Sequence, residues 1–357
     1  MRFLLVLLVL GGCAPEPEAQ AQRVIGYHAW WMQDSWQDFD LGLYDKILFF
    51  EFAVQPDGSV SETHGWPDRW TPLIDAVHQA GGKVAPTFAI LDPVLFSAVL
   101  GDPAARNRLK NTILSMVTSA EADGAHLNFE IFEPSSAAAR AGFTALARDL
   151  RRELRAYRAS AELTMFIPGF DYGEAYDEVA LAGVADYLIV QGYDMHWLNG
   201  PTAGPVAPVS GWDGASWEGI TSRFAGLDIP ADKITMAVPY FGYEWPTVSA
   251  VAGASTRGEG VPITYAPVSG DLLPLIRISA RQRAAQYGIK RDPVSGSPYY
   301  SYQGSGGWYQ GWFEDAESMR AKYRFVNRRG LGGVAVFLLG YDGGLLEPIL
   351  REEFRGR

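Results

Sequence analysis

The stretch DGAHLNFEI, residues 123–131, alternates strictly between apolar and polar side chains after its first two residues and ends its polar series on a carboxylate. A β-strand sends successive side chains to opposite faces. His126, Asn128 and Glu130 therefore share one face of a predicted strand. Four apolar residues form the other face: Ala125, Leu127, Phe129 and Ile131.

The polar face of this strand has two interpretations. On an antiparallel sheet, a polar face simply contacts water. Along this chain, however, strand candidates alternate with helical segments, which favours a parallel sheet covered by helices. The polar row then points into a barrel or a cleft, and a buried row that ends in Glu130 is a candidate site.

Eight apolar segments are predicted to be strands, and helical runs separate them. The run at 136–159, for example, follows Pro134 and has Ser135 or Ser136 as its cap. Eight strands with crossover helices predict an α/β fold, a closed (β/α)8 barrel. An open doubly wound sheet is the alternative, but no Gly-x-Gly-x-x-Gly turn follows the first strand. The predicted strands are 24–31, 46–54, 83–90, 125–132, 162–168, 186–194, 233–241 and 333–339.

Length and composition fit a single large domain. The chain has 357 residues, of which 48% are hydrophobic, and it is long enough to bury a large core. The formal net charge of −11 argues against nucleic acid as a partner, because phosphate binding requires clustered Lys and Arg. The one basic cluster, at 148–158, alternates with Leu and Ala as a solvated helix face does. One break in the strand spacing, at 244–318, is too long for a loop and predicts an inserted unit.

The N-terminal residues have the pattern of a lipoprotein signal peptide. Arg2 gives a short positive region, an apolar run too short to span a bilayer follows, and LGGC at 10–13 fits the lipobox at which such peptides are cut. Cys13 is the only cysteine, so a role as lipid acceptor explains it better than an internal disulfide. An ordinary signal peptide that happens to contain Cys is the alternative.

This N-terminal pattern predicts both the domain organisation and the location. We expect a protein of the bacterial cell envelope that is held to a membrane by its N-terminal lipid, at the outer membrane or the cell surface, facing the periplasm or the exterior. The predicted parts are a signal peptide at 1–12, a flexible tether at 13–22 and the barrel domain at 23–357.

Tryptophan placement gives a second, independent signal. The 11 tryptophans fall at or after the carboxyl ends of predicted strands, or in the inserted unit. Active sites of such barrels form at that end, and flat aromatic rings match the C–H faces of sugar rings. Any single Trp is more simply explained by loop packing. Together they predict a carbohydrate-binding face, with Trp197 and Trp245 among its residues.

Residues 123–130 resemble the Asp-Gly-x-x-x-Asp-x-Glu octet on the fourth barrel strand of glycoside hydrolase family 18, the chitinases and endo-β-N-acetylglucosaminidases. Glu130 is present, whereas Asn128 stands where nearly all active members have Asp, and His126 where many have another Asp. The sixth strand of the family has Met-x-Tyr-Asp, with Gln191 here in place of Met, and the eighth ends in a Trp, with Phe337 here. Segments 24–28, 187–197, 236–243 and 332–337 resemble its first, sixth, seventh and eighth strands.

The resemblance implies a TIM barrel with a small α+β insertion between strands 7 and 8, at about 246–312. It implies a glycosidase without a cofactor, whose partner is an oligosaccharide or polysaccharide containing N-acetylglucosamine. In this family the 2-acetamido oxygen of the substrate attacks in place of a second carboxylate. Glu130 is then the acid and later the base, Asn128 orients the acetamido N–H, and Tyr193 donates to its carbonyl. The predicted substrate contacts are Tyr27, Glu51, His126, Asp194, Tyr243, Trp197, Trp245 and Phe337.

Three alternatives stay open. An inactive carbohydrate-binding protein of the same fold would keep the aromatic residues, although Glu130 is retained. A two-carboxylate glycosidase would pair Glu51 with Glu130 across the mouth, although Glu51 is more simply a hydrogen-bonded interior residue. A metal enzyme is disfavoured, because the five histidines show no ligand spacing.

The identity of the glycan also stays open at this point. The Asn-x-Glu pair resembles glycoside hydrolase family 85 as well, whose endo-β-N-acetylglucosaminidases are active with that arrangement, so Asn128 does not by itself indicate an inactive protein. Chitin oligomers, the glycan strands of peptidoglycan and N-glycan cores all offer a β-linked N-acetylglucosamine.

Overall fold

The computed structural model describes residues 22–268 and 278–356 of the chain. The predicted signal peptide and nearly all of the predicted tether, including Cys13, lie outside the described residues. In the part that is described, no helix is both long enough and apolar enough to cross a lipid bilayer.

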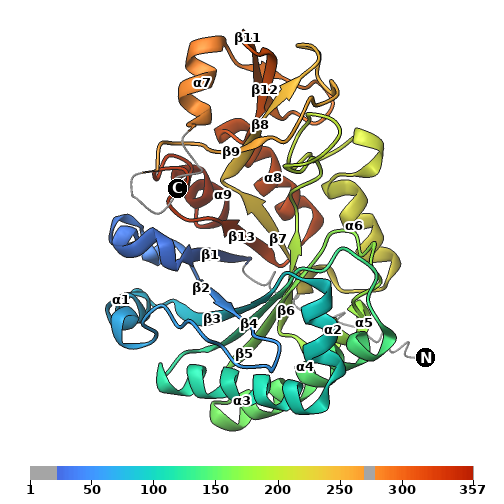
Figure 1. The fold of residues 1–357 in the computed structure, drawn as a ribbon. Coiled ribbons are helices and arrows are strands. Elements are labelled where there is room, and N and C mark those ends of the chain that lie inside the picture. Colours follow the sequence, from blue (N-terminus) through green and yellow to red (C-terminus); the bar gives the residue numbers. More distant parts are fainter. Residues whose placement is uncertain (1–21, 269–277, 357) are drawn as a thin grey trace, which may run out of the picture.

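Eight parallel strands of the described chain close into a barrel, and helices cover its outside (Figure 1). Strands β1 to β7 follow one another around the barrel in chain order, and β13 closes the ring between β7 and β1. The predicted (β/α)8 barrel is confirmed, and each predicted strand segment overlaps an observed strand. The barrel strands are β1 (Arg23–Ala29), β2 (Lys46–Ala53), β3 (Lys83–Ile90), β4 (Gly124–Phe129), β5 (Glu162–Ile167), β6 (Tyr187–Gln191), β7 (Ile234–Pro239) and β13 (Gly333–Phe337).

Polar caps fix where several of the helices begin. Ser136, one of the two predicted caps, accepts a hydrogen bond from the N–H of Ala139 at 3.1 Å and starts α4. The helices around the barrel are α1 (Thr71–Gln79), α2 (Pro93–Gly101), α3 (Pro103–Ser119), α4 (Ala137–Tyr157), α5 (Glu178–Val184), α6 (Trp217–Gly226), α8 (Ala316–Arg329) and α9 (Glu347–Phe354). Short 3₁₀ segments are η1 (Trp30–Asp38), η2 (Leu41–Leu43), η3 (Asp68–Trp70), η4 (Trp212–Gly214) and η5 (Ala231–Lys233).

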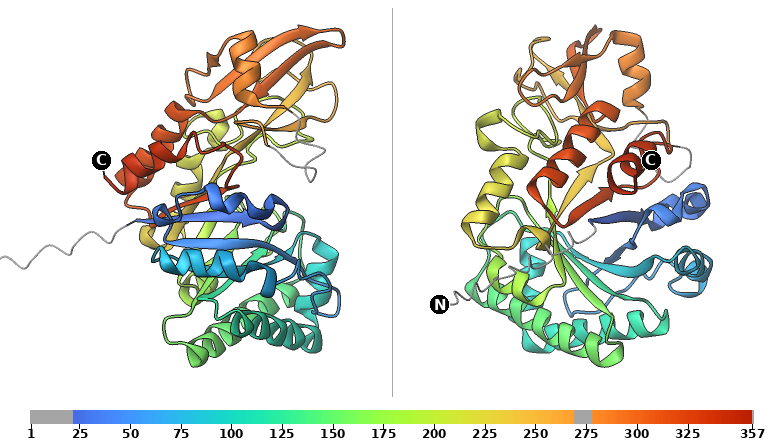
Figure 2. Two further views of the ribbon diagram at one scale, coloured as in Figure 1. Left: turned by 90° about the vertical axis from the view of Figure 1, so that its left-hand side faces the viewer. Right: turned by 180° about the vertical axis from the view of Figure 1, so that it is seen from behind.

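A small antiparallel sheet with one helix lies between β7 and β13, so the predicted α+β insertion is present. It stands on the side of the barrel opposite α3 and α4, as the views in Figure 2 show. Its first strand, β8, begins two residues after the last residue of β7, and Tyr243 of β8 bonds to Asp194, which follows β6. The sheet has the order β10-β11-β12-β8-β9. Its elements are β8 (Phe241–Thr247), β9 (Val261–Thr264), α7 (Ala280–Tyr287), β10 (Lys290–Arg291), β11 (Pro298–Gly304) and β12 (Gly307–Trp312).

A buried ion pair lies at the amino-terminal end of the barrel. Lys46, the first residue of β2, is 2% exposed, and its Nζ lies 2.5 Å from Oε2 of Glu162, the first residue of β5. The acid of the predicted polar row follows β4 at the other end. The barrel therefore separates this structural charge pair from the candidate site.

Candidate active site

β4 carries its polar side chains toward the barrel interior. On the opposite face, Phe129 packs on Phe143 of α4, with ring centroids 5.0 Å apart. His126 and Asn128 are 0% and 2% exposed, and Glu130 follows the strand and is half-buried. The backbone N–H of Glu130 donates to the carbonyl of Ile90 on β3 at 2.9 Å, which holds the acid at the carboxyl end of the strands.

Asn128 and Glu130 form a hydrogen-bonded pair, in which Nδ2 of Asn128 donates to Oε1 of Glu130 at 2.7 Å. Burial raises the pKa of the Glu130 carboxyl to about 7; the Asn128 hydrogen bond lowers this pKa, and the charges of Asp194 and Glu51 raise it. Glu130 is thus able to hold and to release a proton near neutral pH. Because Asn128 uses its amide N–H on Glu130, its amide oxygen is the atom that can accept a hydrogen bond from a ligand.

Tyr176, which the sequence pattern does not identify, fixes the backbone on both sides of Glu130. Its hydroxyl accepts the N–H of Ile131 at 2.8 Å and donates to the carbonyl of Phe129 at 2.5 Å. Tyr176 is 1% exposed and lies between β5 and α5. No periodicity or motif marks this residue in the sequence, so only the fold reveals it as a positioning residue.

His126, two residues before Asn128 on β4, forms a buried hydrogen-bonded pair with Tyr27 of β1. Nε2 of His126 lies 3.0 Å from the Tyr27 hydroxyl, and Nδ1 lies 2.9 Å from Oγ1 of Thr164. Burial, and to a smaller extent the charge of Lys46, lowers the pKa of His126 to about 3, so the ring is neutral near pH 7. The sequence places His126 and Tyr27 among the substrate contacts. They are 0% and 2% exposed and bonded to each other, so they lie inside the barrel, and their contact with substrate stays a prediction.

Asp194, Tyr193 and Tyr243 form a second group of polar side chains at the mouth, after β6 and on β8. The Tyr243 hydroxyl, from β8 of the insertion, donates to Oδ1 of Asp194 at 2.9 Å, and both side chains are half-buried. Burial raises the pKa of the Asp194 carboxyl to about 6 against the lowering effect of that hydrogen bond. Burial also raises the pKa of Tyr193 well above its usual value, so its hydroxyl stays protonated and can donate.

Phe337, the last residue of β13, gives the site an apolar surface. Its half-buried ring contacts Phe50 and Tyr27 edge-on, with centroids 5.2 and 5.5 Å apart, and lies 6.1 Å from Tyr193 and 6.2 Å from Phe241. The sequence does not predict Phe50 and Phe241 as walls of this surface. Phe50 lies on β2 and Phe241 on β8, and neither strand pairs with β13, so no local pattern predicts that these rings meet Phe337.

The tryptophans divide into exposed and buried ones, and this corrects one prediction. Trp197, in the segment that follows β6, is 50% exposed and is able to contact a ligand. Trp245 is 0% exposed, and its Nε1 donates to the carbonyl of Leu198 at 3.0 Å. Its ring packs 5.4 Å from that of Tyr243. Trp245 therefore has no surface to offer a sugar, and it supports Tyr243.

Glu51, near the end of β2, is half-buried. Its Oε2 is buried and has no hydrogen-bond partner among the described residues, so it is not the hydrogen-bonded interior residue of the simpler interpretation. Burial raises the pKa of the Glu51 carboxyl to about 7. The mouth of the barrel thus holds three carboxyl groups with raised pKa values: Glu51, Glu130 and Asp194.

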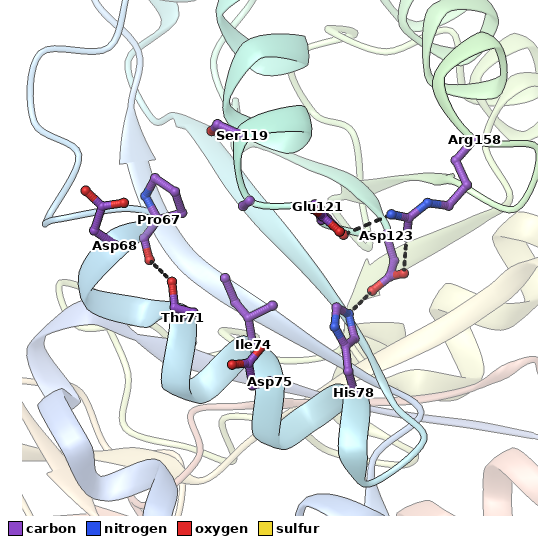
Figure 3. Close-up of a pocket in the computed structure, with 11 residues that line it drawn as sticks. Pro67, Asp68, Thr71, Ile74, Asp75, His78, Ser119, Glu121, Asp123 and Arg158 are labelled. Carbon is purple, nitrogen blue, oxygen red and sulfur yellow. Dashed lines mark hydrogen bonds and ion pairs between the residues drawn. The ribbon is translucent and has the colours of Figure 1, made fainter.

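A separate hollow of about 510 Å³ lies beside α1 and the turn into β4 (Figure 3). Asp123, which precedes β4, accepts from the N–H of Val84 at 2.9 Å and lies 2.7 Å from Nε2 of His78 and 3.0 Å from Nη1 of Arg158. These bonds join three segments at the amino-terminal end of the strands, away from Glu130. We assign this cluster to the stability of the barrel.

The groups at the mouth are able to transfer a proton, through Glu130. They are also able to form hydrogen bonds to a ligand, through the amide of Asn128 and the hydroxyl of Tyr193. Within residues 22–268 and 278–356, no group of three or more His, Cys, Asp and Glu side chains gathers in a way that could hold a metal ion.

Comparisons with known proteins point to one family. The model of "Glycosyl hydrolases family 18" matches residues 23–342. The cortical fragment-lytic enzyme of Bacillus cereus is 22% identical over 308 residues, which cover 82% of this chain and 64% of the relative. A class V chitinase of Arabidopsis thaliana is 25% identical over 289 residues, which cover 77% of this chain and 71% of the relative.

Solved structures share the fold. A family GH18 chitinase from Cycas revoluta in complex with (GlcNAc)3 superimposes with a TM-score of 0.78 at 17% identity, over 93% of this chain and 99% of that chain. The Bacillus relatives are longer proteins, and the matched part of the chain spans between 52% and 67% of their length.

Proposed function

The chain belongs to glycoside hydrolase family 18, and from that premise we propose that it hydrolyses β-linked N-acetylglucosamine in glycans by a substrate-assisted, retaining mechanism. The observation that carries the proposal is the pair at the end of β4: a half-buried Glu130, whose pKa burial raises to about 7, held by Asn128 at 2.7 Å.

In the first step Glu130 acts as the acid. The 2-acetamido oxygen of the bound sugar attacks the anomeric carbon, and the bond from that carbon to the leaving oxygen breaks. The leaving oxygen takes the proton of Glu130, which becomes a carboxylate. The sugar becomes a cyclic oxazolinium ion, whose ring carries the positive charge.

In the second step Glu130 acts as the base. A water molecule attacks the anomeric carbon from the face that the leaving group vacated, and its proton passes to the Glu130 carboxylate. The bond to the acetamido oxygen breaks, which restores the acetamido group and leaves a product in the β configuration. Two inversions give net retention, and the acid is ready for the next cycle.

The neighbouring residues orient the acetamido group. The amide oxygen of Asn128 accepts its N–H, and the Tyr193 hydroxyl donates to its carbonyl oxygen. Asp194 and Tyr243, joined at 2.9 Å, line the reacting subsite, and Phe337 contacts the apolar face of the sugar.

Chitin oligomers, the glycan strands of peptidoglycan and N-glycan cores all contain the β-linked N-acetylglucosamine that the proposed mechanism requires. The similarity to a chitinase solved with (GlcNAc)3 and to a cortical fragment-lytic enzyme supports chitin oligomers and the glycan of peptidoglycan. We test this by incubating the purified protein with chitooligosaccharides, peptidoglycan and a high-mannose glycopeptide and reading the products by mass spectrometry. Cleavage of at least one supports the proposal; measurable binding without cleavage of any would favour an inactive carbohydrate-binding protein.

We predict that kcat/KM falls as pH rises through about 7. Glu130 has to be protonated for the first step, and burial raises its pKa to about 7. Above that pH the protonated fraction drops about tenfold per unit. Initial rates from pH 5 to 9 on an unactivated oligosaccharide measure this limb. A rate that stays level up to pH 9 would contradict Glu130 as the acid.

We further propose that Cys13 carries lipid and anchors the protein to a membrane of the cell envelope. The support is the LGGC sequence at 10–13, after a short basic and apolar leader. In cells fed an alkyne analogue of palmitate, the native chain should be labelled and should sediment with membranes. Cys13→Ser should abolish both. An unlabelled, fully soluble native chain rules the anchor out.

A further inference from the structure

In the proposed reaction a positive charge develops on the sugar, but Asn128 offers no negative charge to stabilise it. The oxazolinium ion is a cation, yet Asn128 contributes an amide oxygen and no charge. Asp194 is already bonded to Tyr243 at 2.9 Å. Glu130 becomes an anion during the first step, but it has to take up a proton again in the second. A further carboxylate at the mouth would therefore have a defined task.

An irregularity in β2 turns Glu51 toward this mouth. The register between β2 and β3 shifts between Phe49 and Phe52, and these two rings lie together, with centroids 5.4 Å apart. Residues three apart share a face only where the strict alternation of a strand is broken. The two residues between them, Phe50 and Glu51, therefore leave that outer face together.

The contacts of Phe50 show where the displaced pair goes. Its ring lies 5.9 Å from that of Tyr27 and 5.2 Å from that of Phe337, both of which belong to the site. Glu51 follows Phe50, and its charge is near enough to Glu130 to raise the pKa of that acid. Among the described residues, no Lys, Arg or His pairs with Glu51, and its buried Oε2 has no hydrogen-bond donor.

We propose that Glu51 supplies the negative charge that Asn128 does not: it stabilises the oxazolinium ion electrostatically from β2. The inference rests on the proposed function and names a residue of the same site. A buried carboxylate without a partner is unfavourable in the resting protein. The oxazolinium ion becomes the partner of the Glu51 carboxylate, and it exists only during the reaction. The interaction is therefore stronger in the transition state than in the ground state.

The pH dependence that Glu130 gives to kcat/KM is a readout that a purely structural role of Glu51 would not move. Glu51, Asn128 and Asp194 act on the pKa of Glu130, and the hydroxyls of Tyr27, Tyr193 and Tyr243 lie close enough to feel its charge. The charge of Glu51 raises the pKa of Glu130. In Glu51→Gln, the pKa of Glu130 should therefore fall, and the basic limb of kcat/KM should move to lower pH.

The test moves the carboxylate from β2 to β4. It compares the native chain with Glu51→Gln, with Asn128→Asp and with the double variant. We expect Glu51→Gln to lower kcat by about tenfold to a hundredfold with KM nearly unchanged. Asn128→Asp places a carboxylate on β4, so the double variant should recover most of that loss. Normal kcat in Glu51→Gln, or a double variant as slow as Glu51→Gln alone, would overturn the proposal.

A binding measurement separates this inference from the proposed function. Calorimetry with a chitobiose-derived thiazoline, a mimic of the cyclic intermediate, needs no turnover. Its affinity should drop about tenfold in Glu51→Gln, while the affinity for neutral chitotetraose stays the same. If the native protein cleaves no glycan, the proposed function fails, and the thiazoline still decides the role of Glu51. Equal thiazoline affinity in both chains, or no binding to either, overturns that role.

Discussion

Glu130→Gln should lower the hydrolysis rate by about a hundredfold to ten-thousandfold, the range that loss of a general acid typically costs. Gln keeps the shape of the side chain and can still accept the hydrogen bond that Asn128 donates at 2.7 Å, but it has no acidic proton. Folding and affinity for oligosaccharides should therefore stay near native. Turnover of an unactivated oligosaccharide measures the loss, with thermal unfolding and chitotetraose binding in parallel.

Glu133→Gln is the matched control for this variant. Glu133 is exposed in the loop that follows β4, and the change in charge is the same. We expect its rate to stay near native. This result would show that the loss of one carboxylate matters only at position 130. Near-normal turnover by Glu130→Gln would mean that another group is the acid.

Asn128→Ala should lower kcat by about a hundredfold or more, because misplacement of the attacking group by about 1 Å can cost that much. The substitution removes the amide oxygen that orients the acetamido group. It also removes the hydrogen bond that lowers the pKa of Glu130, so that pKa should rise. The basic limb of the pH profile should then move to higher pH, the direction opposite to Glu51→Gln.

Asn128→Asp is the control that keeps the acceptor. A carboxylate oxygen can accept the acetamido N–H, and its charge favours the oxazolinium ion, so we expect this variant to stay active. His126, neutral and bonded to Tyr27 and Thr164, lies two residues before it on β4. An Ala variant as fast as the native protein, or an inactive Asp variant beside an active Ala variant, would refute the orienting role of residue 128.

The fold is predictable because its signals are local. Each barrel strand is a short apolar segment bounded by turns, and the period of two in 125–131 by itself places His126, Asn128 and Glu130 on one face. The same period indicates that the apolar face of β4 packs on helices, as Phe129 does on Phe143. The pattern of one strand is therefore enough to identify the acid and its amide neighbour.

The features that the sequence does not predict depend on contacts between distant elements. Trp245 resembles the other aromatic residues at the mouth, but its burial depends on how β8 packs against the segment that follows β6. Tyr176 holds the backbone around Glu130 from the connection after β5, where no period exists. The orientation of Glu51 follows from a register shift, which breaks the alternation on which prediction from sequence relies.

The most direct test of the substrate-assisted mechanism is proton NMR of the products in the first minutes of cleavage, with acetylated and N-deacetylated oligosaccharides compared side by side. If the acetamido oxygen is the nucleophile, the new reducing end appears first as the β-anomer, and the deacetylated oligosaccharide is not cleaved. An α-anomer at early times, or equal cleavage of both substrates, would contradict the mechanism and point to a second carboxylate such as Glu51 acting directly on water or on the sugar.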